Sequence, residues 1–124
     1  MAFSHAIDAT KMQSYVDTAR RRQQKHQENL RQRQQQGLKL AHLAAQILRG
    51  EFEVHRVVLF GSVLSEDTFH ETSDLDLAVW GLPPSDYIKA VARLMELPEF
   101  SIDLVEAEMA STYLREAIAQ GLDL

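Results

Sequence analysis

The chain has 124 residues, a net charge of −5 and no cysteine. This length favours one domain with a modest core, and the lack of cysteine excludes disulfides and thiolate metal sites. No apolar run reaches the roughly 18–20 residues that span a bilayer, and residues 1–10 lack a signal-peptide pattern. We therefore expect a soluble cytoplasmic protein that does not enter a membrane.

The charge is divided unevenly along the chain. Residues 1–50 carry nine Lys or Arg and three acids, whereas residues 51–124 carry four and fifteen. We predict a basic N-terminal helical extension over 1–50 and an acidic domain over 51–124. Such an asymmetry indicates either a partner for the basic half or complementarity between the two halves.

Residues 8–50 contain no proline, and apolar residues recur there at helical steps, which predicts one long helix or two helices broken near Gly37. Residues 20–36 carry six Lys or Arg, seven glutamines and one acid. This window contains the stretch from Arg20 to Arg33. It is either a solvated face or a surface that binds nucleic acid or a protein partner.

From Glu53 onwards the pattern changes to short strands alternating with helices. Gly61 ends the first apolar run, and Ser62 is expected to cap a short helix from Val63. The further predicted elements are strands over 54–60, 74–80 and 100–105 and helices over 87–97 and 109–120. Three short strands covered by helices predict a small α/β sandwich.

Acidic residues mark two of these strands. Asp74 and Asp76 have the i, i+2 spacing that places side chains on one face of a strand, and Asp103 lies in the third strand. If these two strands are neighbours, the three carboxylates can hold two Mg²⁺ ions roughly 3.5–4 Å apart. No histidine stands out as a general base, so we expect Asp103 or a metal-bound hydroxyl in that role.

The pair Gly61-Ser62 is suited to bind phosphate. Glycine lets a backbone approach a ligand closely, and a serine at a helix start offers a hydroxyl and an N–H. Together with the acids, this arrangement predicts a metal-dependent nucleotidyl transfer.

Residues 58–62 and 73–79 resemble the signature of the polymerase-β-type nucleotidyltransferase superfamily. The small size is similar to its minimal nucleotidyltransferase (MNT) branch, the antitoxin half of HEPN/MNT toxin–antitoxin pairs. The resemblance implies a small polymerase-β-like fold over 51–124, with a short mixed sheet covered by helices and a long N-terminal helix. It implies metal ligands at Asp74, Asp76 and Asp103, and phosphate contacts at Gly61 and Ser62.

The resemblance also implies a substrate and a partner. ATP would donate AMP to a tyrosine of a HEPN-type ribonuclease toxin, which would be silenced within an oligomeric complex. The chain departs from the family pattern in two places: the spacer from Val63 to Ser73 has eleven residues instead of ten, and Leu64-Ser65-Glu66 replaces a small-Arg-Gly element. Alternative functions are a non-catalytic antitoxin that occludes its partner, and nucleotide transfer to a small molecule or RNA.

Overall fold

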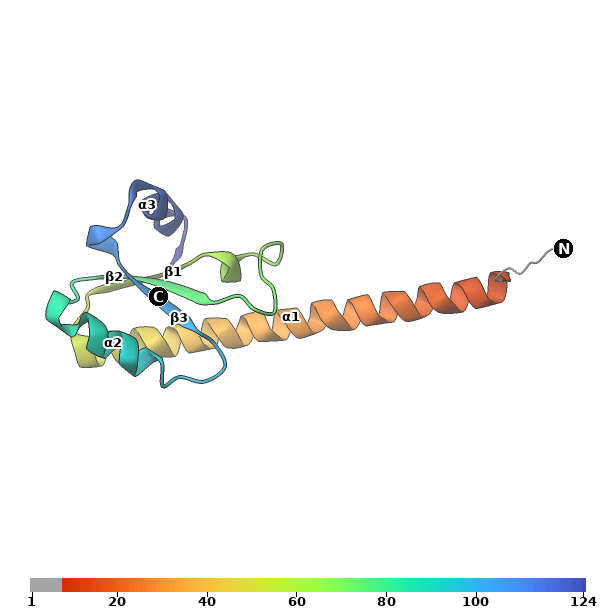
Figure 1. The fold of residues 1–124 in the computed structure, drawn as a ribbon, viewed down its shortest axis with the longest axis horizontal. Helices are drawn as coiled ribbons and strands as arrows, with labels where there is room; N and C mark the ends of the chain where they lie inside the picture. The colour runs from red at the N-terminus through yellow and green to blue at the C-terminus, as the bar shows by residue number, and fades with distance from the viewer. Residues whose placement is uncertain (1–7) are drawn as a thin grey trace.

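The computed structural model describes residues 8–124 and contains a four-stranded sheet between helices (Figure 1). The elements are α1 (Ala9–Phe52), β1 (Arg56–Phe60), β2 (Leu75–Trp80), α2 (Tyr87–Leu94), β3 (Ile102–Glu106), α3 (Thr112–Ala119) and β4 (Leu122–Asp123). Short 3₁₀ turns lie at Ser62–Leu64, Pro84–Asp86 and Ala107–Met109. Within the described part of the chain, no helix is both long and apolar enough to cross a membrane.

The sheet is mixed, as the family resemblance implies. Its strand order is β3-β2-β1-β4, with β1 antiparallel to β2 and β4, and β2 parallel to β3. The predicted strands begin one or two residues before the observed ones. β2 begins at Leu75 instead of Asp74, and β3 begins at Ile102 instead of Phe100. The sequence pattern does not predict β4, because its two residues are too few to alternate visibly.

The predicted helices after β2 are too long. α2 ends at Leu94 instead of Leu97. The segment predicted as a helix from Met109 divides into a 3₁₀ turn and α3, because the side chain of Ser111 caps α3 by accepting a hydrogen bond from the N–H of Leu114. A new N-cap at this point starts a separate helix.

Helix α1 passes Gly37 without a break, so the single-helix alternative is confirmed. Gly37 is buried, and a Cβ at this position would lie 3.2 Å from Cζ of Phe100 and 3.3 Å from Cδ2 of Leu75. The glycine therefore allows close packing of α1 against the sheet. The helix ends where Glu53 adopts a left-handed conformation with φ of 59°.

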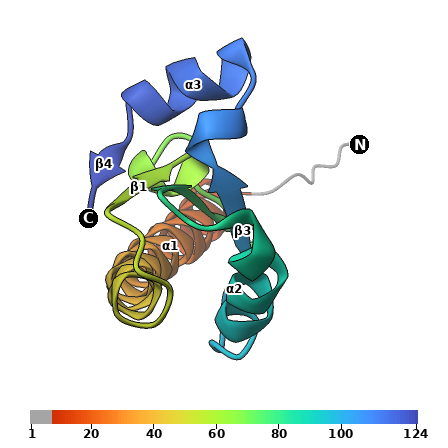
Figure 2. The same ribbon diagram turned by 90° about the vertical axis from the view of Figure 1, so that its left-hand side faces the viewer.

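Different helices cover the two faces of the sheet (Figure 2). α1 and α2 pack on one face, whose core includes Leu75, Leu77 and Leu104. α3 packs on the other face with a smaller core that includes Ala78. Since side chains alternate along a strand, Asp76 and Asp103 belong to the face that α3 covers.

The N-terminal half of α1 extends past the end of the sheet (Figure 1). The side-chain contact nearest to this half joins Nδ1 of His26 to Oε1 of Glu71 at 3.4 Å. Within residues 8–124, no hydrogen bond or ion pair joins residues 9–25 to another element. The contacts of α1 with the rest of the described protein therefore begin at His26 and continue toward the C-terminal end of the helix.

Candidate active site

The strand register brings the acidic residues to one end of the sheet. Asp76 lies opposite Asp103 across the parallel pair of β2 and β3, and opposite Phe60 across the antiparallel pair of β1 and β2. Asp74 precedes β2, and Gly61 directly follows β1. The Gly-Ser turn and the three aspartates therefore share this end of the sheet.

The carboxylates of these aspartates influence one another electrostatically. The pKa of Asp76 is raised to about 6, first by burial, then by the negative charges of Asp103 and Asp74, and by hydrogen bonding with Asp103. Asp76 is half-buried, whereas Asp74 and Asp103 are exposed. Such a concentration of negative charge favours a bound proton or a cation.

Gly61 makes room for this arrangement. Its φ is +90°, a conformation that side chains disfavour, and a Cβ on this residue would collide with Oδ2 of Asp76. Only glycine lets the backbone after β1 lie directly beside the Asp76 carboxylate.

The prediction that Ser62 caps a helix is wrong. Gly61 occupies the cap position of the turn Ser62–Leu64, no side-chain cap bond forms, and the turn has only three residues. A single 3₁₀ turn lacks the dipole of a longer helix, so any phosphate contact must come from the Ser62 hydroxyl and nearby N–H groups.

Two residues that the sequence analysis did not identify hold the Gly-Ser turn in place. Nε2 of Gln34 donates to the carbonyl of Val63 at 2.6 Å, and Oγ1 of Thr68 donates to the carbonyl of Ser62 at 2.9 Å. Gln34 is 29 positions from Val63 along the chain. No local spacing could reveal this contact, because it depends on α1 folding back beside β1.

The three aspartates are chemically suited to bind a divalent cation, but their side chains do not have the geometry of a complete metal site. In residues 8–124, no group of three or more His, Cys, Asp or Glu has the geometry to hold a metal ion. Carboxylates are the protein ligands that Mg²⁺ prefers. The raised pKa of Asp76 indicates that positive charge between these aspartates would be stabilised.

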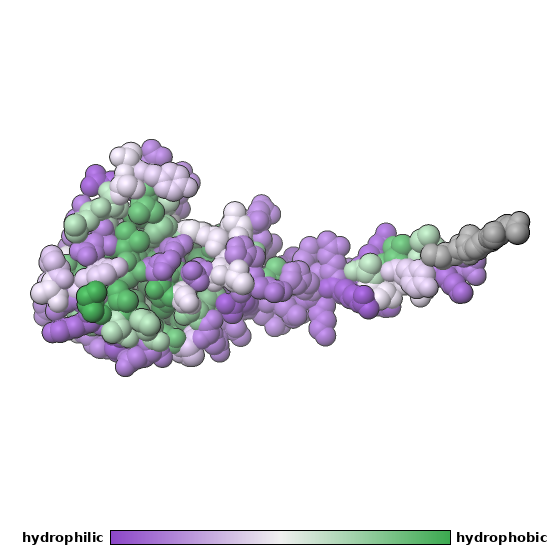
Figure 3. Space-filling model, in the orientation of Figure 1, coloured by the Kyte–Doolittle hydropathy of each residue, from purple (hydrophilic) through white to green (hydrophobic). Residues whose placement is uncertain are grey.

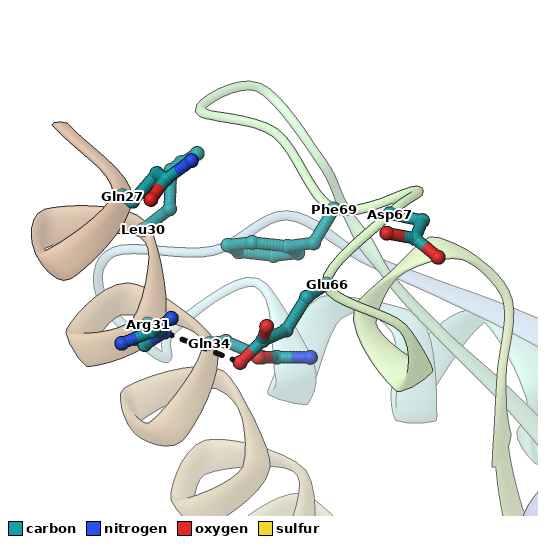
Figure 4. Close-up of a pocket in the computed structure, with 7 residues that line it drawn as sticks. All are labelled: Gln27, Leu30, Arg31, Gln34, Glu66, Asp67 and Phe69. Atoms are coloured by element: carbon teal, nitrogen blue, oxygen red, sulfur yellow. Dashed lines mark ion pairs between the residues drawn. The ribbon is translucent and has the colours of Figure 1, made fainter. Parts of the chain in front are cut away.

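A separate cleft of about 170 Å³ lies between α1 and the loop after the Gly-Ser turn (Figure 4). Phe69 and Leu30 line it, and an ion pair between Arg31 and Glu66 at 3.3 Å crosses it. Phe69 belongs to the core on the α1 face of the sheet. This cleft therefore opens on the face opposite Asp76 and Asp103.

Comparison with known proteins identifies one family. The family model described as "Polymerase beta, Nucleotidyltransferase" matches residues 44–123. This range includes the Gly-Ser turn and all three aspartates. No curated protein gives a significant match.

Solved structures share the fold. A toxin–antitoxin structure with AMP-PNP has 30% identity and a TM-score of 0.53, over 64% of this chain and 67% of that chain. An MntA–HpeT toxin–antitoxin mutant has 26% identity and a TM-score of 0.55, over 67% and 70%. A tri-AMPylated Shewanella oneidensis HEPN toxin in complex with MNT antitoxin has 24% identity and a TM-score of 0.53, over 70% of each chain.

Proposed function

Because the chain belongs to the polymerase beta nucleotidyltransferase family, we propose that it is a Mg²⁺-dependent protein adenylyltransferase. It transfers AMP from ATP to a tyrosine of a cognate HEPN-type ribonuclease toxin, and thereby acts as an antitoxin. The observation that carries this proposal is the register of Asp76 with Asp103 beside the Gly61 turn.

In this proposal, Asp74, Asp76 and Asp103 would hold two Mg²⁺ ions. Mg²⁺ held by these carboxylates would supply positive charge that lowers the pKa of the attacking hydroxyl and stabilises the departing pyrophosphate. Asp76 is the central ligand, because both other carboxylates already raise its pKa. Gly61 and Ser62 hold the triphosphate.

The chemical step is a nucleotidyl transfer. The tyrosine oxygen forms a bond to the α-phosphorus of ATP, and the bond from that phosphorus to the bridging oxygen of the β-phosphate breaks. Pyrophosphate leaves with that electron pair. Asp103 is exposed beside Asp76, and it accepts the tyrosine proton directly or through a water molecule.

Properties of the structural neighbours support the choice of nucleotide and partner. One neighbour was crystallised with AMP-PNP, an analogue of ATP, and the neighbours are toxin–antitoxin complexes. A tri-AMPylated toxin occurs in another structure of the same fold. We propose the same donor, the same modification and an oligomeric complex with the toxin for this chain.

Transfer of label from α-labelled ATP to the cognate HEPN-type protein tests the proposal. Wild type should label the partner in Mg²⁺, and an Asp74→Asn/Asp76→Asn variant should lower the rate at least about 100-fold. The matched control is Asp67→Asn/Asp86→Asn, which removes two acids outside the site and should label as wild type does. Equal labelling by the Asp74→Asn/Asp76→Asn variant would reject the mechanism.

Rescue of cells that express the toxin separates chemistry from occlusion. If AMP transfer silences the toxin, the Asp74→Asn/Asp76→Asn variant should fail to rescue growth although it still binds the toxin. Rescue by this variant would instead support the non-catalytic antitoxin.

A further inference from the structure

Residues 9–25 of α1 form an arm that projects from the body of the protein (Figure 1). At 1.5 Å per residue the arm is about 25 Å long. Local contacts favour its helical form: Asp8 accepts from the N–H of Lys11 at 2.8 Å, and Gln13 donates to Asp17 at 2.9 Å. The arm continues a helix that is already packed against the sheet, and no hydrogen bond or ion pair joins it to another element within residues 8–124.

An apolar stripe runs along the arm. It consists of Met12, Tyr15, Val16 and Ala19, whose i, i+3, i+4, i+7 spacing places them on one side of the helix. The side chains of Met12 and Tyr15 are 50% and 58% exposed. Figure 3 shows apolar side chains near the far end of the arm, separated from the body by a hydrophilic stretch.

The stripe lies on the same side of α1 as the residues that pack against the core. Ala19, Leu30 and Ala41 follow one another at intervals of eleven residues, which is three helical turns. Leu30 packs against the core and Ala41 is fully buried in it. The stripe therefore continues the core-facing side of the helix beyond the point where the sheet ends.

Arginines flank the stripe. Arg20 lies one turn after Val16 on one side, and Arg22 lies one turn after Ala19 on the other. The arm carries five Lys or Arg and a single acid, Asp17. None of these five cations forms an ion pair within residues 8–124. An apolar stripe between bare cations complements a helix whose own stripe is flanked by acids.

The arm extends from the active-site end of the molecule. Figure 1 shows the segment between β1 and β2 at the end of the sheet from which the arm continues. Gln34 and His26 of α1 contact this segment, at Val63 and Glu71. A helix seated on the stripe would therefore lie in front of the sheet end that carries Gly61 and Asp76.

From these observations we infer that the arm is the docking surface for the protein that receives the nucleotide, and that it binds an acidic amphipathic helix of that protein. The identity of the acceptor rests on the proposed function. The stripe supplies apolar contact, and the flanking arginines select acidic partners and accelerate encounter. A second copy of the arm is disfavoured, because each arm carries five Lys or Arg and one acid, so that two arms would repel each other. RNA would use the cations but leave the apolar stripe exposed.

The test measures the dissociation constant of the full-length chain for the cognate HEPN-type protein. The stripe variant is Met12→Gln/Val16→Gln, in which glutamine, a residue of good helix propensity, replaces two apolar residues of the stripe. Ser14→Gln/Thr18→Gln makes the same change, with the same spacing, on the opposite side of the arm. The stripe variant should bind at least tenfold more weakly, and the control should bind within twofold of wild type. Circular dichroism checks that both variants keep their helix content.

The charge component is tested separately. Arg20→Gln/Arg22→Gln should weaken binding about threefold to tenfold at low salt and reduce its salt dependence. Any of three results would overturn the inference: no binding by wild type, unchanged binding by the stripe variant, or a wild-type dimer that the stripe variant abolishes. A short single-stranded RNA that binds the arm and displaces the partner regardless of the stripe would favour nucleic acid instead.

This test is independent of catalysis. The Asp74→Asn/Asp76→Asn variant should bind the partner as tightly as wild type. If stripe-dependent binding occurs without AMP transfer, the proposed function fails and the docking surface stands. If AMP is transferred by the stripe variant with wild-type affinity, the docking surface fails and the proposed function stands.

Discussion

At the scale of single residues, the raised pKa of Asp76 shows that the negative charge of this site lowers the stability of the folded protein at neutral pH. Burial, and then the charges of Asp103 and Asp74, raise its pKa to about 6, whereas an unfolded aspartate titrates near 4. The folded state therefore binds the proton more tightly than the unfolded state does. The stabilisation from this proton is fully present below about pH 4 and is lost as the pH rises through about 6.

Asp103→Asn should therefore stabilise the protein at pH 7.5 while it abolishes AMP transfer. The substitution removes the neighbouring charge that most raises the pKa of Asp76. After discounting for the half-exposed position of Asp76, we expect a gain of about 1 kcal/mol in the free energy of unfolding. Urea denaturation at pH 4.5 and pH 7.5 measures it, and the gain should be smaller at pH 4.5.

The control for this prediction is Asp67→Asn, which changes an exposed acid in the loop after the Gly-Ser turn. It should leave the pH dependence of stability as in wild type. A loss of stability at pH 7.5 in Asp103→Asn, or an unchanged dependence on pH, would show that the two carboxylates do not repel each other.

Gly61 is the second residue on which the site depends. Gly61→Ala should lower the free energy of unfolding by about 1–3 kcal/mol, because its φ of +90° is strained for alanine and its Cβ would meet Oδ2 of Asp76. In an Asp76→Ala background the same change should cost less, since the collision with the carboxylate is gone. Equal costs in the two backgrounds, measured by chemical denaturation, would contradict the close approach.

At the scale of elements, two glycines in α1 have opposite roles. Gly37 lies against Phe100 and Leu75, whereas nothing lies within 4 Å of a Cβ at Gly50. Gly50→Ala should raise the free energy of unfolding by about 1 kcal/mol through helix propensity. Gly37→Leu should lower it by about 2 kcal/mol or more through overpacking. Thermal melts of both variants check this, and a stabilised Gly37→Leu would refute the close packing.

The elements also show what sequence patterns can and cannot predict. The long helix and the order of its following strands and helices follow from periodicity, because strands of five or six residues and a helix of 44 residues carry strong patterns. The mixed direction of the strands follows from the family resemblance alone. β4 was missed, because two residues cannot alternate visibly. The helix cap at Ser62 was wrong, because Gly61 adopts a conformation that ends β1 and takes the cap position itself.

Some features of the candidate site were also predictable from the sequence, and others were not. The spacing of Asp74 and Asp76 predicts a shared face. Asp103 is expected beside them only if the second and third predicted strands are neighbours, and the register of β2 with β3 meets this condition. The roles of these residues as metal ligands, and the division at residues 50 and 51, stay predictions. Gln34 and Thr68, which hold the Gly-Ser turn, could not be predicted because their contacts arise from tertiary packing between segments with no shared pattern.

At the scale of the whole molecule, the uneven charge along the chain has a spatial meaning. The acidic half folds into the body that carries the three aspartates, and the basic half provides α1, whose free arm extends beyond it (Figure 1). Internal pairing uses part of this charge, as in Arg31 with Glu66. The arginines of the arm form no ion pair within residues 8–124, and we propose that they contact an acidic partner.

Intact-mass spectrometry of the cognate HEPN-type protein shows directly whether this chain transfers AMP to it. After incubation with this chain, ATP and Mg²⁺, the partner should gain the mass of one or more AMP groups. The gain should disappear when EDTA removes the metal and when Asp76→Asn replaces wild type. An unchanged partner mass after incubation with wild type would show that the chain does not transfer AMP to this protein. Equal gain of AMP from Asp76→Asn or in EDTA would show that transfer needs neither Asp76 nor the metal.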